Sequence, residues 1–219
     1  MVIFNIKTLT IFIGLIFAFI LLSNGLDSEV VHSFDTFIAS RVEVYSSDPM
    51  TKLMIVVTYI GSYRVEYSVL FLSVVLFLFR KKNFLIPIML TSNLIGVRFF
   101  NKLLKELFER QRPPSEQILY AGGYSFPSGH AMISIAFYGF IAYIIVKQYN
   151  HQVKQSSVYA FFIGLLIFFI GISRIYLRVH YPTDVIAGFL AGGAWLLFCI
   201  VCFNYFSKLT KELRKKMET

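Results

Sequence analysis

Long apolar stretches alternate with short polar or basic segments along most of the chain, and this pattern predicts helices that cross a membrane. A membrane-spanning helix needs about 17–25 mostly apolar residues. Apolar runs predict six spans, at about residues 8–22, 63–79, 83 to beyond 96, 129–146, 156–172 and 185–206. We therefore expect an all-α integral membrane protein with six transmembrane helices, forming one transmembrane domain over residues 1–219.

Two further segments predict helices that are associated with the membrane without crossing it. Residues 30–45 place apolar side chains at helical spacing in a polar context, which is typical of an amphipathic helix on the membrane surface. Residues 51–60 are apolar but too short to span, and we expect a short interfacial helix there. In the alternative interpretation, residues 51–79 form one tilted helix that buries Arg64 and Glu66 at a high energetic cost.

The composition agrees with a membrane protein and argues against nucleic-acid binding. Of the 219 residues, 57% are hydrophobic and 15% are charged, whereas roughly 25% are charged in soluble domains. The net charge of +9 would suggest a nucleic-acid partner in a soluble protein, but much of the excess lies beside apolar runs. Lys and Arg there contact anionic lipids. We expect the lipid bilayer as a partner and no nucleic acid, while the oligomeric state is not predicted.

The basic residues also predict an orientation. In a six-span protein, Lys7, the turn at residues 80–82, the linker at 147–154 and the tail at 208–216 fall on one side. The positive-inside rule makes that side cytoplasmic. We expect a multi-pass protein of the cell membrane with both termini in the cytoplasm. The loops at 106–127 and 173–184 then face the extracytoplasmic side.

Three polar motifs fall near this predicted outer face. They are Lys105 followed after six residues by Arg112-Pro, then Pro-Ser-Gly-His at residues 127–130, and Ser-Arg at 173–174 followed by His180 and Asp184. Arginine, lysine and hydroxyl groups are the donors that surround a tetrahedral phosphate. Ser128 and Gly129 lie at a predicted helix start, where unpaired N–H groups attract an anion.

The same motifs supply groups for phosphoryl transfer. One neutral imidazole can attack phosphorus, and a second can protonate the leaving oxygen. Asp184, four residues after His180, is placed to hold the His180 ring in one tautomer. The three motifs contain no carboxylate cluster of the kind that Mg²⁺ needs. We therefore expect no metal and no cofactor.

In this order and spacing, the three motifs resemble the signatures of the type-2 phosphatidic acid phosphatase superfamily. The six-span layout is similar to the bacterial membrane lipid phosphatases of this superfamily, which are of the phosphatidylglycerophosphatase B or undecaprenyl-diphosphatase type. The resemblance implies that His180 is the nucleophile, that Asp184 orients it and that His130 protonates the leaving group. It also implies a phosphate-binding set. This set comprises Lys105, Arg112, Ser128, Gly129 and Arg174.

We therefore expect a metal-independent phosphatase that removes a phosphate from a membrane lipid through a phosphohistidine. Candidate substrates are phosphatidylglycerol phosphate, phosphatidic acid and undecaprenyl diphosphate. One alternative is a haloperoxidase that uses the same pocket for vanadate, although its relatives in this superfamily are generally soluble and larger. A second alternative is an anion transporter without catalysis, which would need polar groups across the whole bilayer.

Overall fold

The computed structural model describes residues 6–79, 84–148 and 153–217, and within these residues the chain is helical and contains no strand. The expectation of an all-α protein is confirmed. The predicted turn at residues 80–82 and part of the predicted linker at residues 147–154 lie outside the described residues. The helices are α1 (Ile6–Asn24), α2 (Glu29–Glu43), α3 (Asp48–Ile60), α4 (Tyr63–Phe79), α5 (Leu85–Phe108), α6 (Gly129–Gln148), α7 (Val153–Tyr176) and α8 (Pro182–Met217).

The described helices include four that are long and apolar enough to cross a membrane, namely α1, α6, α7 and α8. A fifth span arises if α3 and α4, which meet at a bend of 46°, are counted as one broken span. Helix α5 has 24 residues, which is long enough, but its second half carries Arg98, Lys102 and Lys105. Length and composition therefore support four to five spans, fewer than the six that we expected.

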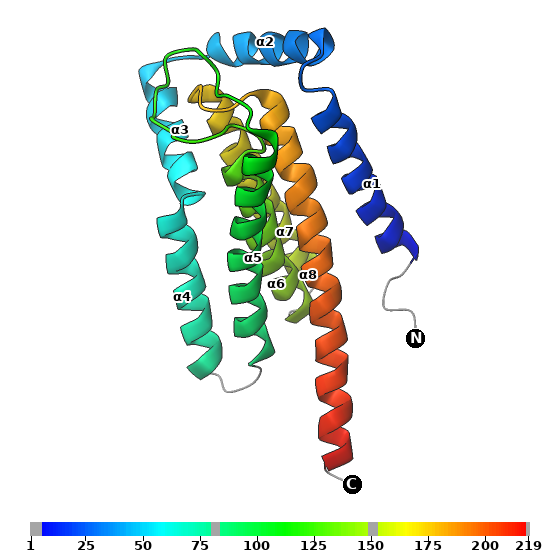
Figure 1. The fold of residues 1–219 in the computed structure, drawn as a ribbon. Coiled ribbons are helices and arrows are strands. Elements are labelled where there is room, and N and C mark those ends of the chain that lie inside the picture. Colours follow the sequence, from blue (N-terminus) through cyan, green and yellow to red (C-terminus); the bar gives the residue numbers. More distant parts are fainter. Residues whose placement is uncertain (1–5, 80–83, 149–152, 218–219) are drawn as a thin grey trace.

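The bend between α3 and α4 differs from our expectation for residues 51–79. Two helices form, as expected, but α3 continues roughly along the bundle into α4 instead of lying across its end (Figure 1). The break falls at Gly61, where a side chain would come within 2.6 Å of Ile170 on α7 and 3.2 Å of the His130 ring on α6. Glycine therefore lets the break pack closely against two central helices.

Helix α6 lies at the centre of the bundle and packs against α5, α7 and α8. Its contact with α8 is close because Gly188 and Gly192 have no side chains. A Cβ atom at Gly188 would lie 2.7 Å from the backbone oxygen of Ser128, and one at Gly192 would collide with the backbone oxygen of Met132. Glycine at these two positions therefore lets α8 approach the backbone of α6.

Helix α2 lies across one end of the bundle, while both described ends of the chain point toward the other end (Figure 1). Ser28 caps the helix by accepting a hydrogen bond from the Val31 N–H. The apolar side chains of Val30, Phe34 and Phe37 are exposed, and Asp35 is the buried residue of the helix. Helix α2 is therefore amphipathic. It lies across the end of the bundle and buries the carboxylate of Asp35 against it.

Candidate active site

Backbone hydrogen bonds draw the three predicted motifs together at the bundle end that α2 covers. The Ser125 N–H donates to the Arg110 carbonyl at 2.7 Å, which folds the loop after α5 back on itself. The Ser128 N–H donates to the Asp184 carbonyl at 2.9 Å, which joins the start of α6 to the start of α8. Segments that are far apart in the sequence therefore meet at one end of three helices.

His180 is buried at the centre of this region. Its Nδ1 lies 3.2 Å from Ser125 Oγ and 3.4 Å from Asp184 Oδ2, while Nε2 lies 3.3 Å from Arg112 Nη1. Burial lowers the pKa of His180 to about 3, although the nearby Asp184 carboxylate acts in the opposite direction. The free imidazole is therefore neutral at neutral pH, as attack on phosphorus requires.

Asp184 is completely buried, and four neighbouring groups surround its carboxylate. Oδ2 accepts hydrogen bonds from Ser125 Oγ at 2.5 Å and from the Tyr181 N–H at 2.9 Å, in addition to facing His180. Oδ1 accepts from Arg110 Nη1 at 2.6 Å. Because Asp184 is held on both oxygens, its position relative to His180 is fixed.

Arg110 connects this site to helix α2. Its Nη2 contacts Asp35 Oδ2 at 2.8 Å, and its guanidinium lies over the Tyr181 ring at 4.2 Å from the ring centre. Asp35 in turn accepts hydrogen bonds from the backbone N–H and the hydroxyl of Thr183. Arg110, Ser125 and Asp35 were not among the residues predicted from the sequence. Arg110 stands two residues before Arg112 in the first motif, but no spacing in the sequence links it to Asp35.

The predicted phosphate-binding cations surround the same region. Arg112 donates to the Gly122, Gly123 and Val179 carbonyls, and burial lowers its pKa. Lys105 Nζ donates to the Tyr124 carbonyl and, at 3.2 Å, to that of Ser125. Lys105 also interacts electrostatically with Arg112 and Arg174. Three basic side chains are thus held near one another, an arrangement that an anion would stabilise.

Two residues of the predicted set, Arg174 and Ser128, each have one buried donor atom without a hydrogen-bond partner. Arg174 is 4% exposed and donates from Nη1 to Thr58 Oγ1 at 2.6 Å, but its Nε is unpaired. The hydroxyl of Ser128 is buried and also unpaired. Buried polar groups in native proteins are nearly always satisfied. Unpaired donors of this kind fit a site that binds a ligand rich in acceptor oxygens.

His130 and Gly129 lie in the first turn of α6. His130 is half-buried and packs against Gly61, and it interacts electrostatically with Arg174 and His180. A side chain at Gly129 would come within 2.9 Å of Asn101 Oδ1, so glycine allows α5 to approach the start of α6.

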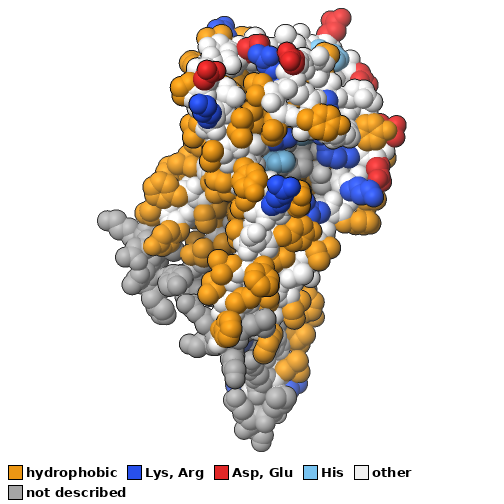
Figure 2. All heavy atoms as spheres, turned by 90° about the vertical axis from the view of Figure 1, so that its left-hand side faces the viewer, with side chains coloured by type: hydrophobic (Ala, Val, Ile, Leu, Met, Phe, Trp, Pro, Cys, Tyr) orange, Lys and Arg blue, Asp and Glu red, His pale blue; other side chains and the backbone are white. Residues whose placement is uncertain are grey.

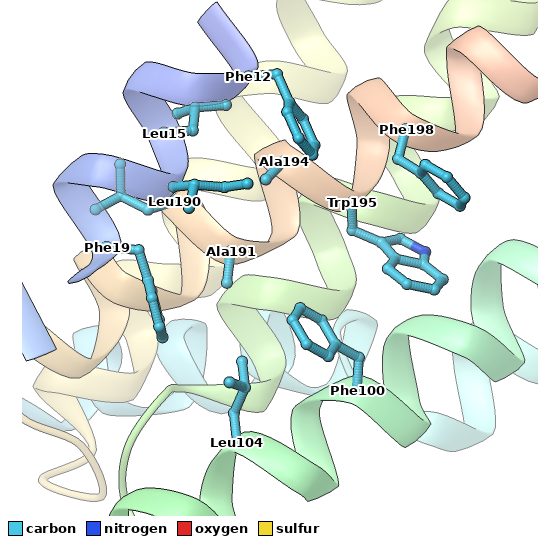
Figure 3. A pocket seen from close by; sticks show the side chains of 11 residues that line it. Phe12, Leu15, Phe19, Phe100, Leu104, Leu190, Ala191, Ala194, Trp195 and Phe198 are labelled. Atoms are coloured by element: carbon cyan, nitrogen blue, oxygen red, sulfur yellow. The ribbon is translucent and has the colours of Figure 1, made fainter.

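The structure contains two cavities near this site. One, of about 330 Å³, lies beneath α2 and reaches His180 and Tyr181. The other, of about 320 Å³, is an apolar groove in which side chains of α1, α5 and α8 face one another (Figure 3). The rings of Phe19, Phe108 and Phe126 pack together beside it. The groove is lined by apolar side chains, and one of them, Phe19, contacts Phe126, which precedes Pro127 and Ser128 of the polar site.

Charged side chains gather toward the end that α2 covers, and apolar side chains dominate the face below (Figure 2). On this face, several basic side chains lie close to a histidine (Figure 2). Among the described residues, no group of three or more His, Cys, Asp or Glu side chains could hold a metal ion. The donor set at the site is instead cationic and suits an anion.

Comparisons with known proteins agree with this arrangement. Residues 83–208, more than half of the chain, match the family model of the PAP2 superfamily. The chain belongs to the PAP2 superfamily. It is a phosphate-ester hydrolase, and its apolar helices make it a multi-pass membrane protein.

Two curated relatives of the PAP2 superfamily are similar in sequence. Phosphatidylglycerophosphatase B of Bacillus subtilis (strain 168) is 30% identical over 208 residues, which cover 93% of this chain and 98% of the relative. Lipid A 4'-phosphatase of Bacteroides thetaiotaomicron is 32% identical over 127 residues, which cover 52% of this chain and 50% of that relative.

Two solved structures share the fold. A transmembrane PAP2-type phosphatidylglycerolphosphate phosphatase from Bacillus subtilis matches with a TM-score of 0.82 and 28% identity, covering 90% of this chain and 96% of that chain. Aquifex aeolicus LpxE matches with a TM-score of 0.57 and 24% identity, covering 75% of this chain and 93% of that chain. The second likeness shows the fold alone.

Proposed function

We propose that this PAP2 protein hydrolyses the terminal phosphate of a membrane lipid through a phosphohistidine at His180, without a metal ion. The observation that carries the proposal is the buried, neutral His180 beside a group of basic side chains with unpaired donors. A neutral imidazole is nucleophilic, and fixed cations stabilise the charge that develops on a transferring phosphoryl group.

In the proposed reaction, His180 attacks phosphorus through Nε2 while Nδ1 keeps its proton. Ser125 and Asp184 face Nδ1, so they support this tautomer. Lys105, Arg112, Ser128, Gly129 and Arg174 hold the phosphate oxygens. His130 gives a proton to the leaving oxygen, and the bond from phosphorus to that oxygen breaks. His130 then takes a proton from water as the water attacks the phosphohistidine, which releases phosphate and restores His180.

Phosphatidylglycerol phosphate is the substrate that we place first, because the relative that covers nearly the whole chain is a phosphatidylglycerophosphatase. Phosphatidic acid and undecaprenyl diphosphate share its essential features, a terminal phosphate and long hydrocarbon chains. The apolar helix surfaces and the groove between α1, α5 and α8 are compatible with such chains.

We also propose the six-span topology that the sequence predicts. It counts α5 as a span despite its charges, of which Lys105 lies in the site. It takes α3 and α4 together as one broken span, where the sequence predicts a span at residues 63–79 alone. Both described chain ends then lie on one side, which the positive-inside rule makes cytoplasmic. The active site faces the extracytoplasmic side.

A phosphate-release assay on the purified protein in mixed micelles tests the proposed function. Phosphatidylglycerol phosphate, phosphatidic acid and undecaprenyl diphosphate are compared, each with and without excess EDTA. We expect release from at least one lipid that survives EDTA and is abolished by His180→Ala. Release that continues in the folded His180→Ala variant would contradict the nucleophile, and EDTA loss restored by Mg²⁺ would contradict the metal-free reaction.

A further inference from the structure

A buried ion pair links α4 and α5 outside the residues already assigned to phosphate. Glu66 on α4 pairs with Arg98 on α5, and the Glu66 side chain is 0% exposed while that of Arg98 is 25% exposed. Ionised side chains inside a membrane-spanning region are costly and mark functional sites more often than structural ones. The pair therefore calls for an explanation beyond packing.

The pair lies on the His130 side of the active site. Arg98 precedes Lys105 by about two helical turns, roughly 10 Å along the axis of α5. Glu66 stands in the first turn of α4, just after the break at Gly61 that packs against the His130 ring. Arg98 and His130 also interact electrostatically. Glu66 and its partner Arg98 thus lie just beyond the helix break that contacts His130.

Arg98 retains unused capacity to bind an anion. One terminal nitrogen contacts Glu66, and the guanidinium lies over the Tyr67 ring at 5.0 Å from its centre. Its buried Nε has no hydrogen-bond partner, nor has the second carboxylate oxygen of Glu66. An arginine that is oriented by a carboxylate and an aromatic ring, and is still partly exposed, is preorganised to bind a further acceptor.

The chemistry of the leaving group indicates what this acceptor is. If His130 protonates the leaving oxygen, the leaving group extends from His130 away from His180. In phosphatidic acid that group is a neutral diacylglycerol. In phosphatidylglycerol phosphate it carries a phosphodiester across a glycerol bridge, and in a lipid diphosphate it carries a second phosphate. Only the last two bring an acidic phosphorus group toward Arg98.

We propose that Arg98 binds a second acidic phosphorus group, carried by the leaving group, and so favours substrates that contain one. Glu66 is a positioning residue that holds the guanidinium toward the His130 side of the site. This proposal rests on the proposed function, because it takes His130 as the group beside the leaving oxygen. It adds a substrate class that the phosphate-binding set alone does not distinguish.

The test compares phosphatidylglycerol phosphate with phosphatidic acid of the same acyl chains. Arg98→Gln should lower kcat/KM for phosphatidylglycerol phosphate about 10- to 100-fold, the effect of losing one hydrogen bond to a charged group. For phosphatidic acid, the change should stay within about threefold, on the order of experimental context effects. Farnesyl diphosphate forms a third arm. A similar loss of kcat/KM for farnesyl diphosphate in Arg98→Gln would show that the second phosphate of a diphosphate also reaches Arg98. A loss confined to phosphatidylglycerol phosphate would show that the glycerol bridge is needed.

Glu66→Gln separates binding from a merely structural role. Removing the carboxylate takes away the group that orients Arg98, so KM for phosphatidylglycerol phosphate should rise while KM for phosphatidic acid stays unchanged. A purely structural pair predicts the same loss from both single variants on both lipids. The double variant Glu66→Gln/Arg98→Gln keeps two amides that can hydrogen-bond to each other, and it should fold and show the selective loss of Arg98→Gln.

Lys102→Gln is the matched control, because Lys102 is a cation one turn further along α5 whose side chain is 74% exposed. It should leave the ratio of the two lipids unchanged. Equal losses on both lipids in Arg98→Gln and the double variant, or no loss on phosphatidylglycerol phosphate, would overturn the proposal. Failure of the proposed function is a different result, in which the wild-type protein releases phosphate from neither lipid.

Discussion

Replacing Arg110, a residue that no sequence motif identified, should slow catalysis without weakening substrate binding. Arg110 joins two buried carboxylates, at 2.6 Å from Asp184 and 2.8 Å from Asp35, and its own side chain is only 11% exposed. Its guanidinium donates to Asp184, Asp35 and Thr183. Its proposed task is to hold Asp184, and through Asp184 the ring of His180, in one geometry.

The perturbation is Arg110→Gln. Glutamine carries no charge, and its single amide group cannot donate to both carboxylates as the guanidinium group does. A lost hydrogen bond to a charged group is worth about 1.5–3 kcal/mol, so kcat should fall about 10- to 100-fold. KM should stay within about threefold, since uniform substrate binding is untouched. Removing one partner of a buried pair also costs about 3–5 kcal/mol, so the variant should unfold at a lower temperature.

The assay is steady-state phosphate release on folded protein, with thermal unfolding measured in the same detergent. Arg178→Gln is the control, because Arg178 forms an exposed ion pair with Glu43 on α2 at the same end of the bundle. An exposed pair contributes about 0–1 kcal/mol, so that variant should behave like the wild type. A raised KM with unchanged kcat in Arg110→Gln would show that Arg110 binds phosphate instead, and wild-type values throughout would refute the positioning role.

Three further predictions test the leaving-group acid, the titration of the nucleophile and the helix packing. His130→Ala should slow lipid substrates far more than an aryl phosphate, whose leaving group needs no proton; equal losses in both assays would argue against this role. Because the pKa of folded His180 is about 3, below its ordinary value of about 6.5, the unfolded chain binds a proton that the folded chain does not as pH falls. Between about pH 7 and pH 5 the wild type should therefore lose about 2 kcal/mol more stability than His180→Asn, and parallel pH profiles of the melting temperature would contradict it. Gly192→Ala should destabilise the protein by about 1–3 kcal/mol, because its Cβ collides with the Met132 backbone on α6. Gly164→Ala, where the added atom meets open space, should be neutral or stabilising by up to about 1 kcal/mol, and similar melting temperatures for the two variants would refute the packing argument.

The helices were predictable because each is encoded locally. Apolar runs and helix-start residues such as Ser128 and Pro182 depend on neighbours a few residues away, so their positions could be derived from the chain. The close contact of α6 and α8 was predictable for the same reason, since Gly188 and Gly192 lie one turn apart on one helix. The number of spans does not follow as directly, because α5 is long enough to span while its second half carries Arg98, Lys102 and Lys105.

The support around the site was not predictable, because it depends on contacts between distant segments. Asp35 and Arg110 lie 75 residues apart, and nothing in the acidic segment of α2 distinguishes Asp35 from its exposed neighbours. Likewise, Glu66 was interpreted as too costly to bury, yet the structure buries it against Arg98. A single residue identity cannot show that a partner for its charge will arrive from another helix.

Trapping the covalent intermediate tests the central claim most directly. His130→Ala protein should react with an aryl phosphate but hydrolyse the intermediate slowly, because His130 also activates the water in the proposed reaction. After an alkaline quench, which preserves phosphohistidine, peptide mass spectrometry should find the added phosphate on His180 and should lose it in His130→Ala/His180→Ala. Phosphate on another residue, or burst-phase turnover with no labelled peptide, would contradict the account.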